Sequence, residues 1–93
     1  MAMSISRRQG PLTWAESGSA DFDALFLNHW ERLCRTLFHI LGDWDEAQDL
    51  ALETFERLYR RPPQDPANLS AWLYRVATNL GFNALRARKR RLQ

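Results

Sequence analysis

The chain has 93 residues, of which 45% are hydrophobic and 26% charged, and its formal net charge is +2. This length leaves room for one small domain, and the hydrophobic fraction is too high for a disordered chain. A single cysteine excludes an internal disulfide. The sequence has no signal-peptide pattern and no apolar run near the roughly 20 residues of a membrane span, so we expect a soluble, cytoplasmic domain.

Residues 1–20 mix Gly, Pro and Ser with polar residues and show no sustained period. This composition predicts a flexible N-terminal tail, within which Trp14 is a candidate for docking elsewhere. The folded domain is expected over residues 21–93.

A first helix is predicted over residues 21–41, because apolar residues recur there at spacings of three and four. Ser19 or Asp21 can cap its start, and Gly42 can turn the chain after its end. The predicted apolar stripe consists of Phe22, Leu25, Phe26, His29, Leu33, Leu37, Ile40 and Leu41.

A second helix is predicted over residues 44–60, with Asp43 as its N-cap and Pro62-Pro63 as its stop. Asp45 and Glu46 in its first turn complement the helix dipole. The three prolines that follow it should give the connection a defined shape. The predicted apolar face consists of Ala47, Leu50, Ala51, Thr54, Phe55 and Leu58.

A third helix is predicted over residues 69–88, capped by Asn68 or Ser70, and the basic run at 86–91 either continues it or frays. Gly81 lies inside this helix and costs up to ~1 kcal/mol relative to Ala. The predicted packing stripe consists of Leu69, Trp72, Leu73, Val76, Ala77, Leu80, Ala84 and Leu85. No strand pattern or repeat occurs, so we predict an all-α bundle of three helices, with an extra short helix as a variant.

The sequence offers no constellation for catalysis. His29 and His39 are ten residues apart on one predicted helix, about 15 Å of rise, which is too far to share a metal. Cys34 has no second cysteine, and a buried structural role is expected for it. Because Gly-rich phosphate loops and serine nucleophile motifs are also absent, we expect no enzyme, no cofactor and no metal.

The second helix carries carboxylates at spacings of three, four and seven, so most of them share one face. The face is either an ordinary hydrated surface or a docking face for a basic or polar helix of another protein. Leu52, which lies off the core stripe, slightly favours docking. The carboxylates are Asp45, Glu46, Asp49, Glu53 and Glu56.

Charge changes sign along the chain. Residues 1–65 hold seven arginines and eleven carboxylates, a net charge of −4, whereas residues 66–93 hold five arginines, one lysine and no carboxylate, a net charge of +6. This asymmetry suggests two surfaces for two partners, the basic one suited to a polyanion. A basic tail that only aids solubility is the alternative.

The third helix mixes aromatic, arginine and asparagine side chains, as nucleic-acid binding requires. Guanidinium groups pair with phosphates, aromatic faces stack on unpaired bases, and amides read base edges. Trp72 begins the apolar stripe, and we expect it in the core. The residues that fall away from the stripe, and are better placed to reach a ligand, are Tyr74, Arg75, Asn79, Phe82 and Arg86.

Two segments resemble the extracytoplasmic-function group of bacterial sigma factors. The segment DEAQDLALETF at residues 45–55 is similar to region 2.2 of that group. The segment SAWLYRVATN at residues 70–79, followed by Asn83 and the basic run at 86–91, is similar to regions 2.3 and 2.4. The first helix fits region 2.1, so the resemblance covers roughly residues 21–91 and implies a sigma-2 bundle.

The resemblance implies two partners. The region 2.1–2.2 surface would bind the β′ clamp helices of core RNA polymerase through Asp45, Gln48, Asp49, Leu52, Glu53 and Glu56. Regions 2.3–2.4 would recognise and melt the promoter −10 element, and the loop before them would help to hold a flipped non-template base. The DNA-binding residues implied are Arg61, Asn68, Tyr74, Arg75, Asn79, Asn83, Arg86, Arg88, Lys89 and Arg90.

The chain departs from the family pattern in two respects. Gln48 and Leu52 stand where the family often has Glu and Gln, which affects the detail of the polymerase contact. Family members continue into a sigma-4 domain, whereas this sequence stops at Gln93, so we expect either a fragment of a longer protein or a designed chain. An anti-sigma factor is a further partner left open by the resemblance.

Two rival functions stay open at this point. A helical protein-interaction module could carry a basic tail that has no role with DNA. A basic amphipathic helix at an anionic membrane ranks last, because Asn79, Gly81 and Asn83 interrupt its apolar face.

Overall fold

The computed structural model describes residues 19–93, which form three α-helices and one short 3-10 helix. The α-helices are α2 (Ser19–Leu41), α3 (Trp44–Arg60) and α4 (Leu69–Leu92), and the 3-10 helix η2 covers Pro66–Asn68. No strand occurs in this part of the chain. The predicted all-α bundle of three helices is confirmed, and η2 is its extra short helix.

Two helix ends differ from the sequence prediction. α2 begins at Ser19, so Asp21 lies in its first turn rather than before it, and Ser19 and Ala20 are helical rather than part of a tail. α4 continues to Leu92, so the basic run is helical rather than frayed. The rest of the predicted tail, including Trp14, lies outside the described residues.

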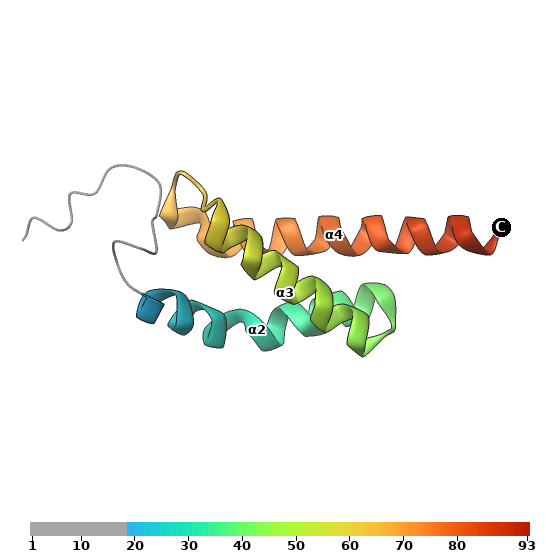
Figure 1. The fold of residues 1–93 in the computed structure, drawn as a ribbon, viewed down its shortest axis with the longest axis horizontal. Helices are drawn as coiled ribbons and strands as arrows, with labels where there is room; N and C mark the ends of the chain where they lie inside the picture. Colours follow the sequence, from blue (N-terminus) through green and yellow to red (C-terminus); the bar gives the residue numbers. More distant parts are fainter. Residues whose placement is uncertain (1–18) are drawn as a thin grey trace, which may run out of the picture.

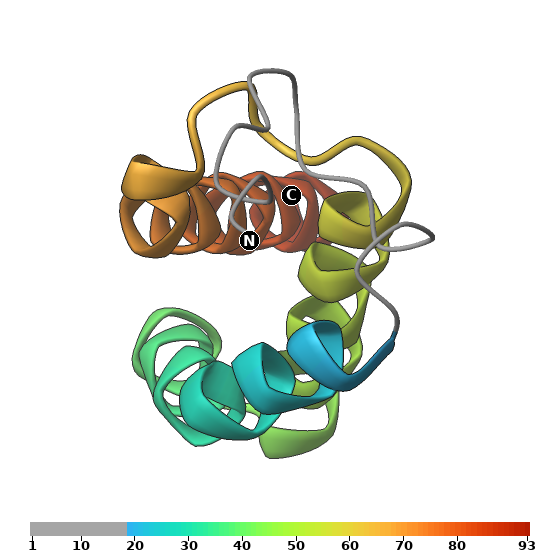
Figure 2. The same cartoon turned by 90° about the vertical axis from the view of Figure 1, so that its left-hand side faces the viewer.

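The helices lie side by side around one core (Figure 1). α2 and α4 point in the same direction, α3 runs back between their ends, and the end-on view shows α3 against both (Figure 2). The last turns of α4 extend past the α2–α3 turn (Figure 1). The fully enclosed apolar side chains are Leu33, Cys34, Leu37, Ala47, Ala51, Phe55, Leu58, Leu73 and Ala77.

Polar groups inside this core are accommodated locally. The Thr54 hydroxyl, which is fully buried, donates to the carbonyl of Leu50 at 2.9 Å within α3. Burial, and secondarily the negative charge of Glu31, raises the pKa of the Cys34 thiol. A thiol held in its neutral form is a poor nucleophile, so the buried structural role expected for Cys34 fits its surroundings.

The α2–α3 turn follows the predicted chemistry. Gly42 adopts a φ of 71°, which favours glycine, and its N–H donates to the carbonyl of Phe38 at 2.7 Å. The Asp43 carboxylate accepts from the N–H of Glu46 at 3.1 Å and so caps α3, as predicted.

The start of α4 is built differently from the prediction. Asn68 stands at the N-cap position, but its side chain makes no capping hydrogen bond. Its amide donates instead to the Asp65 carboxylate at 3.0 Å, and that carboxylate also accepts from the N–H of Ala67 at 3.0 Å. Ser70 lies inside the helix. Asp65 therefore orders the loop that connects α3 to α4.

Gly81 marks a point where α4 packs closely against α2. A Cβ at this position would lie 2.9 Å from Leu37 Cδ2 and 3.1 Å from Ile40 Cδ1. Leu37 is fully enclosed, so it has little freedom to move away. The glycine that seemed a weakness in the sequence is thus a requirement of helix packing.

We expect Gly81→Val to destabilise the fold by about 1–3 kcal/mol, because the added side chain overpacks the α2–α4 contact. Urea denaturation of the full chain measures this change. Ala71→Val is the control, since it places the same β-branched residue at an exposed position of α4. Helix propensity alone would make Ala71→Val slightly less stable and Gly81→Val slightly more stable, so a Gly81→Val variant that loses no stability would contradict the overpacking.

Candidate nucleic-acid interface and acidic face

One side of α4 forms an exposed, carboxylate-free surface, which we call the basic face. It lies opposite Leu73, Ala77 and Gly81, the residues that α4 buries in the core. Phe82 is 47% exposed, which leaves its ring free to stack on a base. The basic face consists of Arg75, Asn79, Phe82, Asn83, Arg86, Lys89 and Arg90.

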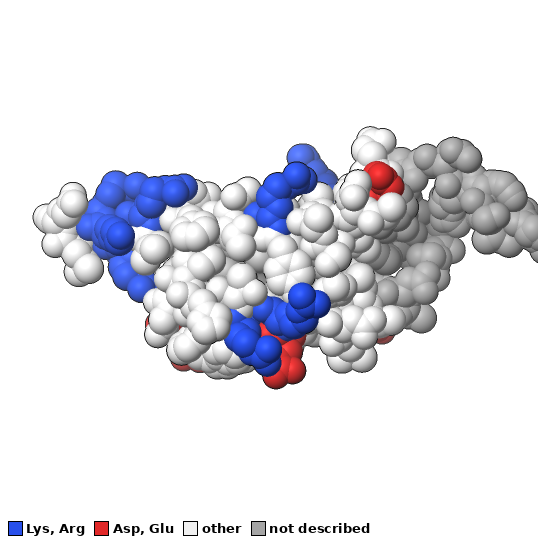
Figure 3. All heavy atoms as spheres, turned by 180° about the vertical axis from the view of Figure 1, so that it is seen from behind, with Lys and Arg blue, Asp and Glu red and all other residues white. Residues whose placement is uncertain are grey.

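The charges of this surface can be followed in Figure 3. Basic side chains gather toward the C-terminal end of α4, and few acidic side chains lie on the face in view. Arg86 donates to the side-chain oxygen of Asn83, which orients both groups on the surface. Exposed guanidinium and amide groups without competing carboxylates favour an anionic ligand.

A pocket adjoins the basic face where the end of α3 meets α4. Its volume is about 620 Å³, and it is lined by Arg57, Arg60, Arg61, Trp72 and Val76. Arg57 forms an ion pair with Glu53 at 3.0 Å, whereas Arg60 and Arg61 make no ion pair within residues 19–93. An aromatic wall beside two uncompensated guanidinium groups suits a base with its phosphate.

This pocket brings together residues that sequence reasoning assigned elsewhere or did not consider. Arg61 lines it, as the resemblance implied, but Asn68 does not. Trp72, expected in the core, is half-buried: it packs against the core cluster and also forms part of the wall. Arg57 and Arg60 were not proposed for the site. Their position beside Arg61 just before two prolines is the only sequence signal that could have suggested them.

Tyr74 does not belong to the basic face, contrary to the sequence prediction. It is half-buried and faces α2, where its ring meets that of His29 in an edge-on contact with centroids 6.3 Å apart. The Arg32 guanidinium lies 5.3 Å from the Tyr74 ring centroid. The Tyr74 hydroxyl is buried and has no hydrogen-bond partner within residues 19–93. Tyr74 therefore helps to join α4 to α2.

The environment of His29 favours its neutral form. Burial, and secondarily the positive charge of Arg32, lowers the pKa of the His29 imidazole. His29 and His39 belong to no cluster, since no group of three His, Cys, Asp or Glu side chains in residues 19–93 is placed to hold a metal ion.

No helix within residues 19–93 combines the length and apolar character needed to cross a membrane.

Arg88 was also expected to contact DNA, and in this structure its guanidinium is paired within the bundle. Its guanidinium donates to the Leu41 carbonyl at 2.8 Å and to the Glu46 carboxylate at 2.5 Å. The Arg88 and Glu46 side chains are 31% and 34% exposed, so the pair is partly shielded from water. Arg88 is thus committed to holding α4 against the α2–α3 turn.

The carboxylates of α3 gather on the side of the helix that faces away from the core, and we call this side the acidic face. Four of the residues expected to bind polymerase, namely Asp45, Asp49, Leu52 and Glu56, are exposed on the side away from the core. Leu52 is 48% exposed, as its position off the core stripe suggested. The other two lie at the edges of this face, because Gln48 is half-buried and Glu53 is paired with Arg57.

The chain is similar to known sequences over most of its length. The Sigma-70 region 2 family matches residues 25–91. The chain is 32% identical over 79 residues to the ECF RNA polymerase sigma factor SigE of Mycolicibacterium smegmatis, a match covering 84% of this chain and 31% of that protein. It is 36% identical over 72 residues to the ECF RNA polymerase sigma factor SigW of Bacillus subtilis, covering 75% and 37%.

The RNA polymerase sigma-H factor of Pseudomonas aeruginosa is likewise 36% identical over 72 residues, covering 75% of this chain and 37% of that protein. The chain therefore spans about a third of the length of the curated relatives it matches. No solved structure matches it significantly.

We expect Arg88→Ala to lower the free energy of unfolding by about 1 kcal/mol, because it removes a partly shielded, charge-assisted interaction that closes the bundle. Arg90→Ala, two residues further along α4 on the exposed basic face, should change it by less than about 0.5 kcal/mol. Urea denaturation of the two variants makes the comparison. Equal stabilities would mean that the Arg88 interaction contributes nothing.

Proposed function

The chain belongs to the Sigma-70 region 2 family, in its extracytoplasmic-function group, and we propose that it binds core RNA polymerase and the promoter −10 element. In this proposal the acidic face of α3 docks on the β′ clamp helices, and the basic face of α4 holds the non-template strand. The role is one of binding rather than catalysis. It implies a cytoplasmic location, where bacterial transcription takes place.

The pocket between α3 and α4 is the observation that carries the DNA part of the proposal. It offers an aromatic side chain, Trp72, and two arginines, Arg60 and Arg61, that form no ion pair with any residue of the described part of the chain. A base that leaves the duplex needs a surface on which to stack, and its phosphate needs a cation nearby. The pocket supplies both at the edge of the basic face, where Arg75 and Asn79 continue along α4.

The free energies of base-pair separation and base stacking suggest how the domain would act on DNA. Separating a DNA base-pair step costs ~1.4 kcal/mol on average, and stacking one base on an aromatic side chain returns ~1–3 kcal/mol. A few captured bases and phosphate contacts can therefore hold a short melted segment. They are too few to open a duplex without help, which agrees with a domain that works within a polymerase assembly.

The acidic face supports the polymerase part of the proposal. Asp45, Asp49 and Glu56 present negative charge around Leu52, an exposed apolar centre. An apolar centre with a charged rim is the usual composition of a specific protein interface. Compared with the common family pattern, Gln48 makes this rim less acidic and Leu52 makes its centre more apolar. We therefore expect shape complementarity and apolar contact to contribute more to polymerase binding in this chain.

We expect substitutions on the DNA surface to cause two kinds of loss, one in affinity and one in base preference. Arg61→Ala should weaken binding of the full chain to any single-stranded oligonucleotide by roughly tenfold and reduce its salt dependence, because it removes a phosphate contact. Asn79→Ala should flatten base preference instead, because an amide reads base edges. Selection from a random single-stranded DNA pool, followed by anisotropy titrations over a range of salt concentrations, measures both.

Arg35→Ala is the control for the DNA experiment, because it removes the same charge from α2, where Arg35 pairs with Glu31 at 2.9 Å. It should leave DNA affinity nearly unchanged. An equal loss for Arg35→Ala would show that only net charge matters. A chain that binds no oligonucleotide at low salt would favour the protein-interaction alternative.

We expect Asp49→Lys to weaken binding of the full chain to bacterial core RNA polymerase by at least about tenfold, because it places a cation where the partner is cationic. Glu31→Lys makes the same charge change on the outer surface of α2 and should have little effect. Titration of core polymerase with each fluorescently labelled variant gives the affinities. Unchanged binding of Asp49→Lys would remove the acidic face from the interface.

A further inference from the structure

Arg32 brings a cation from α2 to the edge of α4. Its guanidinium carbon lies over the Tyr74 ring, 5.3 Å from the ring centroid. Arg32 is exposed, and every ion pair within residues 19–93 involves another arginine. Its neighbour Glu31, the nearest carboxylate in the sequence, is paired with Arg35 at 2.9 Å. Arg32 therefore carries a positive charge that no carboxylate of the described residues neutralises.

The contact with Tyr74 positions the guanidinium without using its hydrogen-bond donors. A ring face attracts a cation through its quadrupole, whereas the N–H groups of a guanidinium lie in the plane of the group and point outward. The Arg32 side chain makes no hydrogen bond to another residue in the described part of the chain. A guanidinium that is already held in place loses less side-chain freedom when it binds, and its planar fork matches a phosphate. Arg32 is thus prepared for an anionic oxygen ligand.

Arg32 lies at one border of the exposed side of α4. Tyr74 marks this border, because it faces α2, and Arg75 follows it on the exposed side. The other border is the pocket that Trp72 lines, where the end of α3 supplies Arg61. Both neighbouring helices therefore place an unneutralised arginine beside the basic face. Figure 3 agrees with this arrangement, because basic side chains lie over both α4 (above) and α2 (below), with uncharged surface between them.

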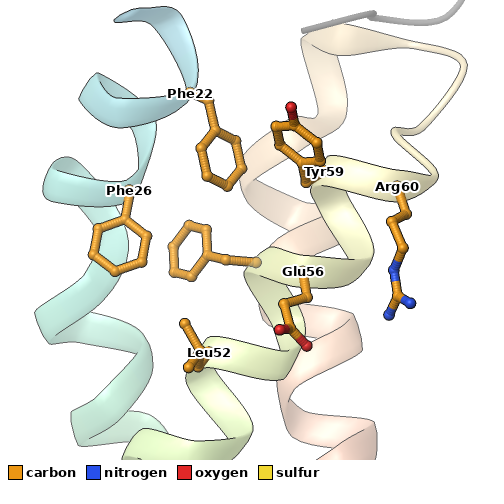
Figure 4. Close-up of a pocket in the computed structure, with 7 residues that line it drawn as sticks. Phe22, Phe26, Leu52, Glu56, Tyr59 and Arg60 are labelled. Atoms are coloured by element: carbon orange, nitrogen blue, oxygen red, sulfur yellow. The ribbon is translucent and has the colours of Figure 1, made fainter. Parts of the chain in front are cut away.

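The side of α2 that faces the end of α3 has a different chemistry. An apolar pocket of about 370 Å³ lies there (Figure 4), lined by Phe22 and Phe26 from α2 and by Tyr59 from α3. Glu56 adds a carboxylate to its lining, and the Arg60 side chain points away from the rings. Negative charge beside apolar rings disfavours a phosphate. A polyanion that reaches α2 is therefore expected on the side that faces α4.

We propose that Arg32 binds a backbone phosphate of the single-stranded DNA that occupies the basic face. This contact, which rests on the proposed function, gives the strand a path. The strand crosses α4 from the Trp72 pocket, past Asn79, to Arg32 on α2, rather than running along the helix toward its C-terminus. An α-helix with its side chains is about 10–12 Å wide, so a few nucleotides complete the crossing.

The crossing path gives the two border arginines different phosphates of one strand. Arg61 holds a phosphate at the pocket, and Arg32 holds one several nucleotides away, with the amide of Asn79 between them. Because the two contacts share no partner, the losses of binding free energy from substitutions at Arg61 and Arg32 should add.

The test is an anisotropy titration of the full chain with fluorescently labelled oligothymidylate over a range of salt concentrations. We expect Arg32→Ala to weaken binding roughly fivefold and to lower the slope of affinity against salt by about 0.7, the value for one phosphate of a single strand. With progressively shortened oligonucleotides, this effect should disappear at a length at which Arg61→Ala still weakens binding, because a short strand fills the pocket before it reaches α2. Far-UV circular dichroism establishes that each variant forms its helices.

Arg35→Ala is the matched control, because it removes the same charge from the same helix at a position that is paired with Glu31. It should leave affinity and salt slope nearly unchanged, and Arg32→Lys, which keeps the charge, should keep the slope. Equal losses in Arg32→Ala and Arg35→Ala would overturn the proposal, since only net charge would then matter. So would an Arg32→Lys variant that loses as much as Arg32→Ala, because packing on Tyr74 would then be responsible.

Failure of this contact and failure of the proposed function give different results. Weakened binding in Arg61→Ala together with unchanged binding in Arg32→Ala would overturn the Arg32 contact and leave the proposed function standing. A full chain that binds no oligonucleotide at low salt would overturn both.

Discussion

The close approach of α4 to α2 at Gly81 is the contact on which the arrangement of the surfaces depends. Because no side chain separates the helices there, α4 has one rotation about its axis that fits against Leu37 and Ile40. That rotation puts Leu73 and Ala77 in the core and turns Arg75 and Asn79 toward water. The position of the basic face is thus a consequence of apolar packing rather than of charge.

The direction of α4 beyond the core has a separate origin. Its last turns pass the α2–α3 turn, where few apolar contacts can hold them (Figure 1). Arg88 supplies a polar attachment by reaching the Leu41 carbonyl and the Glu46 carboxylate. One arginine of the basic run thus holds the helix in place, and this attachment fixes the direction of the segment that carries the exposed Arg86, Lys89 and Arg90.

α3 is the helix through which the surfaces are related to each other. Its buried side, with Ala51 and Phe55, packs on both neighbours, whereas its acidic side faces away from them. Its C-terminal end supplies arginines to the pocket beside α4, and Tyr59 at the same end lines a second pocket, beside α2, with Phe22 and Phe26. α3 therefore borders both pockets as well as carrying the acidic face.

The sequence by itself determined the three helices, the Gly42 turn and the Asp43 cap, because these depend on residues within a few positions of one another. It also determined the family and the two charged faces, since spacing along a helix sets which residues share a side. Only the tertiary structure decided the roles of Tyr74, Arg88 and Gly81. Periodicity gives the angle of a residue around its own helix, but it does not show whether another part of the chain lies opposite that residue. For these three residues, α2 or the α2–α3 turn lies opposite. The pocket at Trp72 escaped prediction for the same reason, because its walls come from two helices that meet only in the folded chain.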